Sequence, residues 1–182
     1  RLTVGGRAVT IPSEGGHLAF SPRDDLETEL LVHLRERFGR VSWERLVSGV
    51  GLTHIYRFFW AREQGSSSGT PPLLSGEDDP AAAVTRAARA GSDASASSAL
   101  SLFVRLYGAF AGEVALLGLP YGGVYLAGGV APTLLDELRQ GAFIAAFCDK
   151  GRMGALTENM PVDVVLDTTV GLKGAALAAA QG

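Results

Sequence analysis

Short apolar strands set between helical segments are the feature that most limits the fold of this 182-residue chain. Residues 122–127 and 162–166 are apolar runs of strand length, and glycines frame the first of them. A long helical pattern over residues 92–117 precedes the first run, and helical patterns at residues 133–138 and 142–147 separate the two runs. Strands that alternate with helices are typical of the α/β class. We therefore predict an α/β fold with two buried strands in the second half of the chain.

The first half of the chain is predicted to be mostly helical after an initial hairpin. Residues 2–11 alternate about a Gly5-Gly6 pair, a pattern typical of a hairpin. Residues 24–38 carry leucines at helical spacing and precede a glycine, which predicts an amphipathic helix. Residues 48–51 predict a break because they include glycines, and an aromatic helix follows over residues 52–62. Further helices are expected at residues 81–90 and 171–180.

A polar segment over residues 64–80 interrupts these helices. It contains serines, glycines and three prolines. We interpret it as a mobile surface excursion within one domain that spans residues 1–182, and not as a domain boundary.

The composition excludes several classes of protein. Hydrophobic residues make up 47% of the chain and the net charge is −3, which argues against a domain built to neutralise nucleic-acid phosphates. One cysteine excludes an internal disulfide framework and a zinc site made of several cysteines. The best apolar run, residues 109–119, is broken by Gly112, Glu113 and Gly118 and is shorter than the roughly 20 residues of a membrane helix. We expect neither a nucleic-acid partner nor a membrane partner.

The first candidate site is the turn Glu14-Gly15-Gly16-His17. Glycines let a backbone approach a ligand closely, and the turn brings a carboxylate and an imidazole to one side. A carboxylate accepts hydrogen bonds from two adjacent hydroxyls, and a neutral imidazole both donates and accepts, so this pair suits a polyhydroxyl ligand. The alternative is a solvated turn with an incidental histidine.

The second candidate is Glu44, which lies beside Trp43 just before the glycine-containing break. We expect a carboxylate among apolar neighbours to be partly buried and then to need a partner. The alternative is a surface glutamate in the first turn of a helix, stabilised by the helix dipole.

The third candidate is the segment of residues 122–132, an apolar strand followed by Gly128-Gly129 and by a proline near a helix start. Backbone amides in such a turn can face a nucleotide. The alternative is a glycine turn present for packing alone.

Several motifs follow one another along the chain: Glu14-Gly15-Gly16-His17, Phe20-Ser21-Pro22, and residues 41–45, 48–52, 56–57, 99–103, 122–132, 143–152 and 171–175. Several independent motifs in one order are more specific than any single motif. In this order the segments resemble the bacterial ATP-dependent glucokinases.

The resemblance implies an actin-like ATPase (ribonuclease H-like) fold, with two α/β domains that close over glucose and ATP. It further implies that Glu14, His17 and Glu44 bind the sugar, that Gly128 and Gly129 lie on the adenosine side of ATP, and that ATP reacts as its Mg²⁺ complex. A cytoplasmic enzyme, and often a homodimer, is typical of the family.

Parts of the family pattern are absent from this sequence. These are the Asp-x-Gly-Gly-Thr-Asn phosphate motif, the Asn-Asp segment with the catalytic aspartate, and a Gly-Thr-Gly-x-Gly phosphate turn. We expect them upstream of Arg1, so that residues 1–182 form a large C-terminal domain truncated at its N-terminal strands and inactive alone. The alternatives are a non-catalytic sugar-binding or regulatory domain of the same fold, and a kinase for another hexose.

Overall fold

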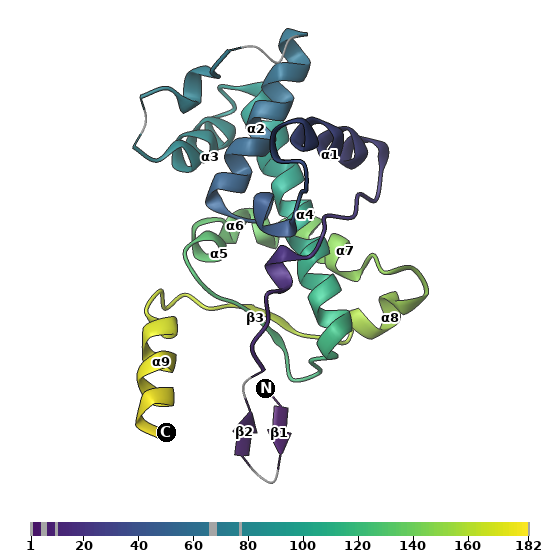
Figure 1. Ribbon diagram of the computed structural model, residues 1–182, viewed down its shortest axis with the longest axis vertical. Helices are drawn as coiled ribbons and strands as arrows, with labels where there is room; N and C mark the ends of the chain where they lie inside the picture. The colour runs from purple at the N-terminus through teal and green to yellow at the C-terminus, as the bar shows by residue number, and fades with distance from the viewer. Residues whose placement is uncertain (1, 5–6, 10, 66–68, 77, 182) are drawn as a thin grey trace. The chain divides into compact units, whose positions relative to one another are not determined.

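The computed structural model describes residues 2–4, 7–9, 11–65, 69–76 and 78–181, and the chain divides into two compact units. One unit is Ser13–Tyr107, and the other combines Arg1–Pro12 with Gly108–Gly182 (Figure 1). The helix α4 (Ala94–Gly118) contributes its first part to one unit and its remainder to the other.

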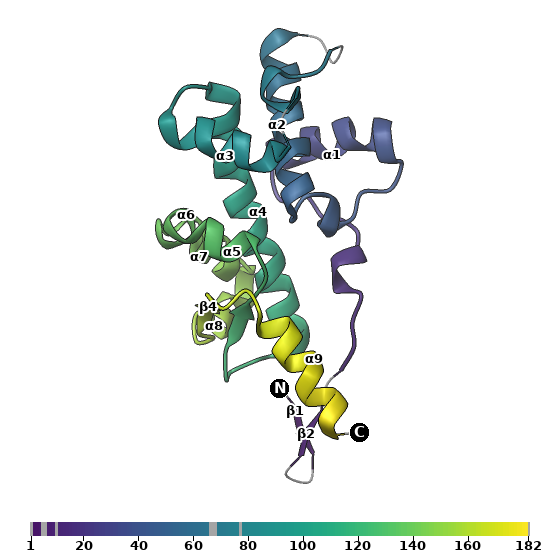
Figure 2. The ribbon, with the colours of Figure 1, turned by 90° about the vertical axis from the view of Figure 1, so that its left-hand side faces the viewer.

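The unit Ser13–Tyr107 is helical. Helix α2 lies between α1 and α3 in both views (Figures 1 and 2), and it contacts each of them. Its elements are η1 (Gly15–His17), α1 (Asp25–Phe38), η2 (Trp43–Arg45), α2 (Gly49–Gln64), η3 (Pro72–Leu74), α3 (Pro80–Ala90) and the first part of α4. Its fully buried side chains include Leu30, Trp43, Leu46, Ile55, Tyr56, Val84, Phe103 and Leu106.

Helix α1 begins and ends close to the predicted positions because its sequence carries both caps. The Asp24 side chain accepts a hydrogen bond from the backbone N–H of Glu27 at 2.8 Å, which satisfies a donor of the first turn. Gly39 ends the helix with φ of 65°, a conformation that glycine adopts without strain. The apolar stripe of α1 buries Leu30 and Leu34.

The predicted break at residues 48–51 is wrong. These residues form the N-terminus of α2, where the Ser48 side chain accepts from the Gly51 backbone N–H at 3.0 Å. Gly51 is required for packing, since a Cβ at this position would collide with the carbonyl of Leu46. The glycine that suggested a break is therefore explained by a close approach of two backbone segments.

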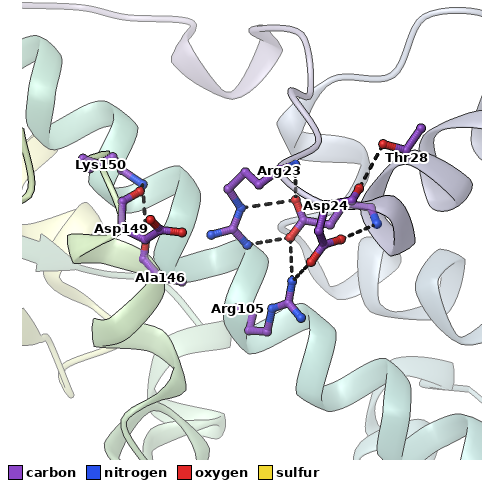
Figure 3. Close-up of polar contacts among 8 residues, drawn as sticks. Arg23, Asp24, Thr28, Arg105, Ala146, Asp149 and Lys150 are labelled. Atoms are coloured by element: carbon purple, nitrogen blue, oxygen red, sulfur yellow. Dashed lines mark hydrogen bonds and ion pairs between the residues drawn. The ribbon is translucent and has the colours of Figure 1, made fainter. Parts of the chain in front are cut away.

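A buried carboxylate joins α1 to α4 within this unit (Figure 3). Glu27 has no exposed surface, and its Oε1 accepts from Arg23 Nη2 at 2.5 Å and from Arg105 Nη2 at 3.1 Å. Its Oε2 accepts from the backbone N–H and the Nε of Arg23, at 2.9 and 3.2 Å. Burial raises the pKa of Asp24, but its hydrogen bonds from Glu27 N–H and the Arg105 guanidinium outweigh this and lower it overall.

Part of the predicted excursion at residues 64–80 packs against the helices. Pro71 is fully buried, and η3 contacts α3. Residues 66–68 and 77 of the predicted excursion lie outside the described residues.

The second unit contains two separate two-stranded sheets in the part of the chain that the structure describes. Strands β1 (Leu2–Val4) and β2 (Arg7–Val9) pair antiparallel, which confirms the predicted pairing, while the Gly5-Gly6 turn lies outside the described residues. Strands β3 (Val124–Leu126) and β4 (Val162–Val164) pair parallel, with Val124 opposite Val162. The helical elements are α5 (Val130–Thr133), α6 (Leu135–Arg139), α7 (Ala142–Cys148), η4 (Gly151–Met153), α8 (Gly154–Thr157) and α9 (Val170–Gln181).

The two predicted strands are shorter and less buried than the sequence suggested. Tyr125, in the middle of β3, is 63% exposed, and Leu166, beyond the end of β4, is 64% exposed. Both strands lie at an edge because the described sheet has two strands. The α/β class is nevertheless confirmed, with helices that precede, separate and follow a parallel pair.

Small residues of α4 allow close contact with α7 in this second unit. A Cβ at Gly108 would collide with the Phe143 carbonyl, and one at Gly112 would collide with the Phe147 carbonyl. By length and composition α4 could also cross a membrane, although more than half of its apolar stretch is buried inside the structure. Core helices of water-soluble proteins meet the same criterion.

Candidate functional site

Two turns that are distant in the sequence, η1 and η2, lie side by side in the unit Ser13–Tyr107. An isolated antiparallel bridge between Ala19 and Ser42 joins the segments that flank them. The Phe20 N–H donates to the Val41 carbonyl at 3.0 Å, and the Trp43 N–H donates to the Leu18 carbonyl at 3.1 Å. The buried rings of Phe20 and Trp43 meet edge to face, 5.0 Å apart, and anchor the bridge in the core.

This bridge brings two of the predicted site residues together. His17 Nδ1 lies 2.9 Å from Glu44 Oε2, and each side chain is 60% exposed. The expected partial burial of Glu44 is wrong, because its apolar neighbours Trp43 and Leu46 turn into the core while its own side chain stays at the surface. A pair this exposed contributes little to stability, so the contact mainly fixes the orientation of two accessible polar groups. When Nδ1–H donates to Glu44, a neutral imidazole keeps Nε2 as an acceptor on its other side.

Glu14 lies in the same turn as His17. Its backbone carbonyl accepts from the His17 N–H at 2.9 Å, and its side chain is exposed. The Gly15 N–H donates to Ser13 Oγ at 3.0 Å, which holds the start of the turn. At Gly16 an added Cβ would lie 3.8 Å from the Glu44 Cβ, an ordinary contact, so the protein backbone alone does not demand glycine there.

One residue that supports the site was not predicted from the sequence. Arg40 Nη2 donates to the His17 carbonyl at 2.8 Å and so holds η1 from the far end of α1. Arg40 follows the terminating glycine of that helix, and nothing in its local sequence indicates a partner in η1.

The His17–Glu44 contact presents a carboxylate and an imidazole together on an exposed surface. Such a pair can hydrogen-bond adjacent hydroxyl groups of a ligand. A site of this kind discriminates among ligands because a missing hydroxyl leaves a polar group without its partner.

The predicted nucleotide-side glycines belong to the other unit. Gly128 has φ of 102°, which favours glycine, and Gly129 precedes α5 with φ of −81°. An added Cβ at either position would meet nothing within 4 Å, so the surface beside both backbones is open. The Gly129 carbonyl accepts from the Thr133 hydroxyl at 2.8 Å.

A family model described as Glucokinase matches residues 2–182 of this chain. The chain belongs to the glucokinase family. The resemblance inferred from the ordered motifs is thereby confirmed.

Individual glucokinases match over nearly the whole chain. A glucokinase of Synechocystis sp. is 43% identical, over 97% of this chain and 53% of that protein. One of Nostoc sp. is 41% identical, over 99% of this chain and 56% of that protein. The crystal structure of a glucokinase from an Antarctic psychrotroph is similar at a TM-score of 0.78 and 29% identity, over 93% of this chain and 50% of that one. The chain thus spans about half the length of the glucokinases that it matches.

Proposed function

We propose that this chain supplies the sugar-binding and adenosine-side surfaces of a glucokinase that transfers the γ-phosphate of ATP to the 6-hydroxyl of glucose. The observation that carries the proposal is the His17–Glu44 contact, which brings an imidazole and a carboxylate together from two distant turns in a member of the glucokinase family.

In this proposal Glu14, His17 and Glu44 hold the ring hydroxyls of glucose. The exposure of the His17–Glu44 pair leaves both side chains accessible, and the bridge between Ala19 and Ser42 fixes them before the sugar arrives. Preorganised hydrogen-bonding groups orient the sugar so that its 6-hydroxyl can reach the nucleotide. These residues therefore affect which sugar binds more than they affect the rate of the phosphoryl transfer.

Gly128 and Gly129 are proposed to contact the adenosine side of ATP, which binds as its Mg²⁺ complex. Their open surroundings support this, since a ligand can approach both backbones without displacing a side chain.

The reaction itself is a phosphoryl transfer. The 6-oxygen of glucose forms a bond to the γ-phosphorus, the bond to the bridging oxygen breaks, ADP leaves, and a general base takes the hydroxyl proton. We propose that an aspartate in the part of the enzyme that this chain does not span is this base, within an actin-like ATPase fold of two domains. A homodimer and a cytoplasmic location belong to the same proposal and rest on the family resemblance alone.

Two substitutions in the intact protein test the two assignments against each other. Glu44→Gln should raise the KM for glucose at least about tenfold, because hydrogen bonds to a charged group are worth about 1.5–3 kcal/mol. It should leave the KM for ATP nearly unchanged. Gly129→Ala, whose φ suits alanine, should raise the KM for ATP and spare that for glucose. Glu29→Gln, at an exposed glutamate of α1 paired with Arg62, is the matched control.

Equal effects of Glu44→Gln on both substrates would refute the sugar-side assignment. A panel of hexoses separates glucose from another sugar as substrate, and sugar binding without ADP release by the intact protein would indicate the non-catalytic alternative. We also propose that the isolated 182-residue chain is inactive, and ADP release at rates near those of intact relatives would contradict this.

A further inference from the structure

A cavity of about 320 Å³ lies in the unit Ser13–Tyr107, between α1, α2 and the segment before η3. Neither the His17–Glu44 pair nor Glu14 lines it. Its size is that of a site for a small metabolite. The lining residues are His33, Leu34, Glu36, Arg37, His54, Arg57, Trp60, Ala61, Gly69 and Pro71.

Two guanidinium groups of this cavity act on each other. Burial and the positive charge of Arg37 both lower the pKa of the half-buried Arg57. Burial also lowers the pKa of His54, and the positive charges of Arg37, Arg45 and Arg57 lower this pKa further. The hydrogen bond between His54 and the Arg45 carbonyl raises the pKa, but by less. The positive groups are thus concentrated around one buried ring.

Within the described part of the chain, Arg37 and Arg57 are not paired with carboxylates. Glu36 also lines the cavity, next to His33. The charge of Glu36 raises the pKa of His33, but burial has the larger effect, so the pKa of His33 is lowered overall. Like charges held close together destabilise a fold unless an anion lies between them.

We propose that this cavity binds the phosphate group of a small phosphorylated metabolite between Arg37 and Arg57. A guanidinium presents a planar fork of N–H donors that matches two phosphate oxygens at once. The indole of Trp60 supplies an apolar wall for the rest of the molecule. A cavity of about 320 Å³ admits a small molecule and excludes a nucleic-acid duplex.

His54 connects this cavity with the turn that carries Glu44. Its Nδ1 lies 2.9 Å from the Arg45 carbonyl, so in the neutral ring Nδ1–H donates and Nε2 remains as an acceptor for a ligand hydroxyl. The Arg45 guanidinium stacks on the Phe38 ring at 4.4 Å, and the Phe38 ring lies 4.9 Å from His54. A phosphate in the cavity therefore acts on groups in direct contact with η2.

Calorimetric titration of the intact protein in phosphate-free buffer with saturating glucose tests the proposal. The probes are inorganic phosphate and glycerol 3-phosphate, with glycerol as the uncharged control. Glucose occupies the sugar site, so binding of either phosphate probe reports a different site. We expect saturable binding, and a Kd weakened at least about tenfold by Arg57→Gln and by Arg37→Gln, equivalent to about 1.4 kcal/mol each.

The matched control is Arg62→Gln, on the same helix as Arg57, because Arg62 is 53% exposed, pairs with Glu29 and does not line this cavity. It should leave the Kd unchanged.

Tighter binding of glycerol 3-phosphate than of phosphate would identify a phosphomonoester as the ligand, and equal binding would identify free phosphate; both outcomes support the site. Arg37 is exposed, so Arg37→Gln should fold even where Arg57→Gln does not. Absence of saturable binding up to about 10 mM, or the same Kd in wild type and Arg37→Gln, overturns the proposal.

Discussion

Replacing Glu27 should destabilise the protein far more than replacing any exposed glutamate of the same helix. Glu27 is fully buried and accepts four hydrogen bonds, three from Arg23 and one from Arg105. Removing one partner of a buried ion pair destabilises a protein by about 3–5 kcal/mol, because the remaining charges stay buried without a counter-charge. In Glu27→Ala the Arg23 guanidinium loses its counter-charge, the Arg23 backbone N–H loses its acceptor, and Arg105 keeps only its contact with Asp24.

The expected magnitude lies at the low end of that range. The Arg23 side chain is 21% exposed and that of Arg105 is 37% exposed, so water can partly replace the lost carboxylate. We expect Glu27→Ala to lower the free energy of unfolding by about 3 kcal/mol. Glu27→Gln, which keeps the shape and one oxygen acceptor, should lower it by about 2 kcal/mol.

Urea unfolding of the intact protein, followed by circular dichroism, measures these differences, since a shift of midpoint at constant slope reports stability. Glu29→Gln is the control on the same helix, because the Glu29–Arg62 pair is about half exposed and its contact is 3.4 Å. It should change the free energy by less than about 0.5 kcal/mol. A double-mutant cycle of Glu27→Gln with Arg105→Gln should show a coupling energy of at least about 1 kcal/mol. A Glu27→Gln protein as stable as Glu29→Gln would refute the reasoning.

Three further predictions concern the same unit. Gly51→Ala should destabilise by about 1–3 kcal/mol, because the new methyl meets the Leu46 carbonyl, although alanine normally favours a helix; a more stable variant in urea unfolding would contradict this. Tyr56→Phe removes the 3.1 Å hydrogen bond from the buried hydroxyl to Asp93 and should lower the thermal midpoint, with a loss of about 1 kcal/mol. The pKa of His54 is lowered by burial from its usual 6.5, so the unfolded state binds the proton more readily and stability should fall as pH drops below about 6.5. His54→Asn, which keeps a side-chain N–H, should flatten this pH dependence in equilibrium unfolding, and an unchanged slope would show that other groups cause it.

Local sequence is sufficient to predict the bounds of a helix that carries its own capping residues. The bounds of α1 follow from the Asp24 cap and from Gly39, both of which act within a few residues of the helix ends. The start of α2 does not follow from local sequence, because Gly51 by itself indicates a break, whereas in the fold it leaves room for the Leu46 carbonyl. That contact depends on how the chain folds back from η2, which no local pattern contains.

The strands were located but their burial was overestimated. An apolar run predicts a strand, yet its burial depends on how many strands pair beside it and on what covers the faces. In the described sheet β3 has one partner, β4, and so Tyr125 is exposed although it lies in an apolar run.

The sequence predicts which residues form the candidate site but does not predict how their side chains contact one another. The motifs suggested Glu14, His17 and Glu44, and the sequence placed His17 beside Glu14 in one turn. The contact between His17 and Glu44 depends on the Ala19–Ser42 bridge, which is a tertiary pairing. The arginines around His54 were missed because they come from η2, α1 and α2, and each is ordinary in its own helix or turn.

The bridge between Ala19 and Ser42 closes a loop of the chain that contains α1. The turn η1 lies just before this loop, and η2 lies just after it. Closing such a loop restricts the chain, and the entropy lost must be recovered by whatever holds its ends together. A sugar bound by His17 and by Glu44 would span those ends as a non-covalent cross-link. Occupancy of the proposed sugar site would then hold a whole helix in place, and the resistance of α1 to detachment would rise with sugar concentration above the Kd.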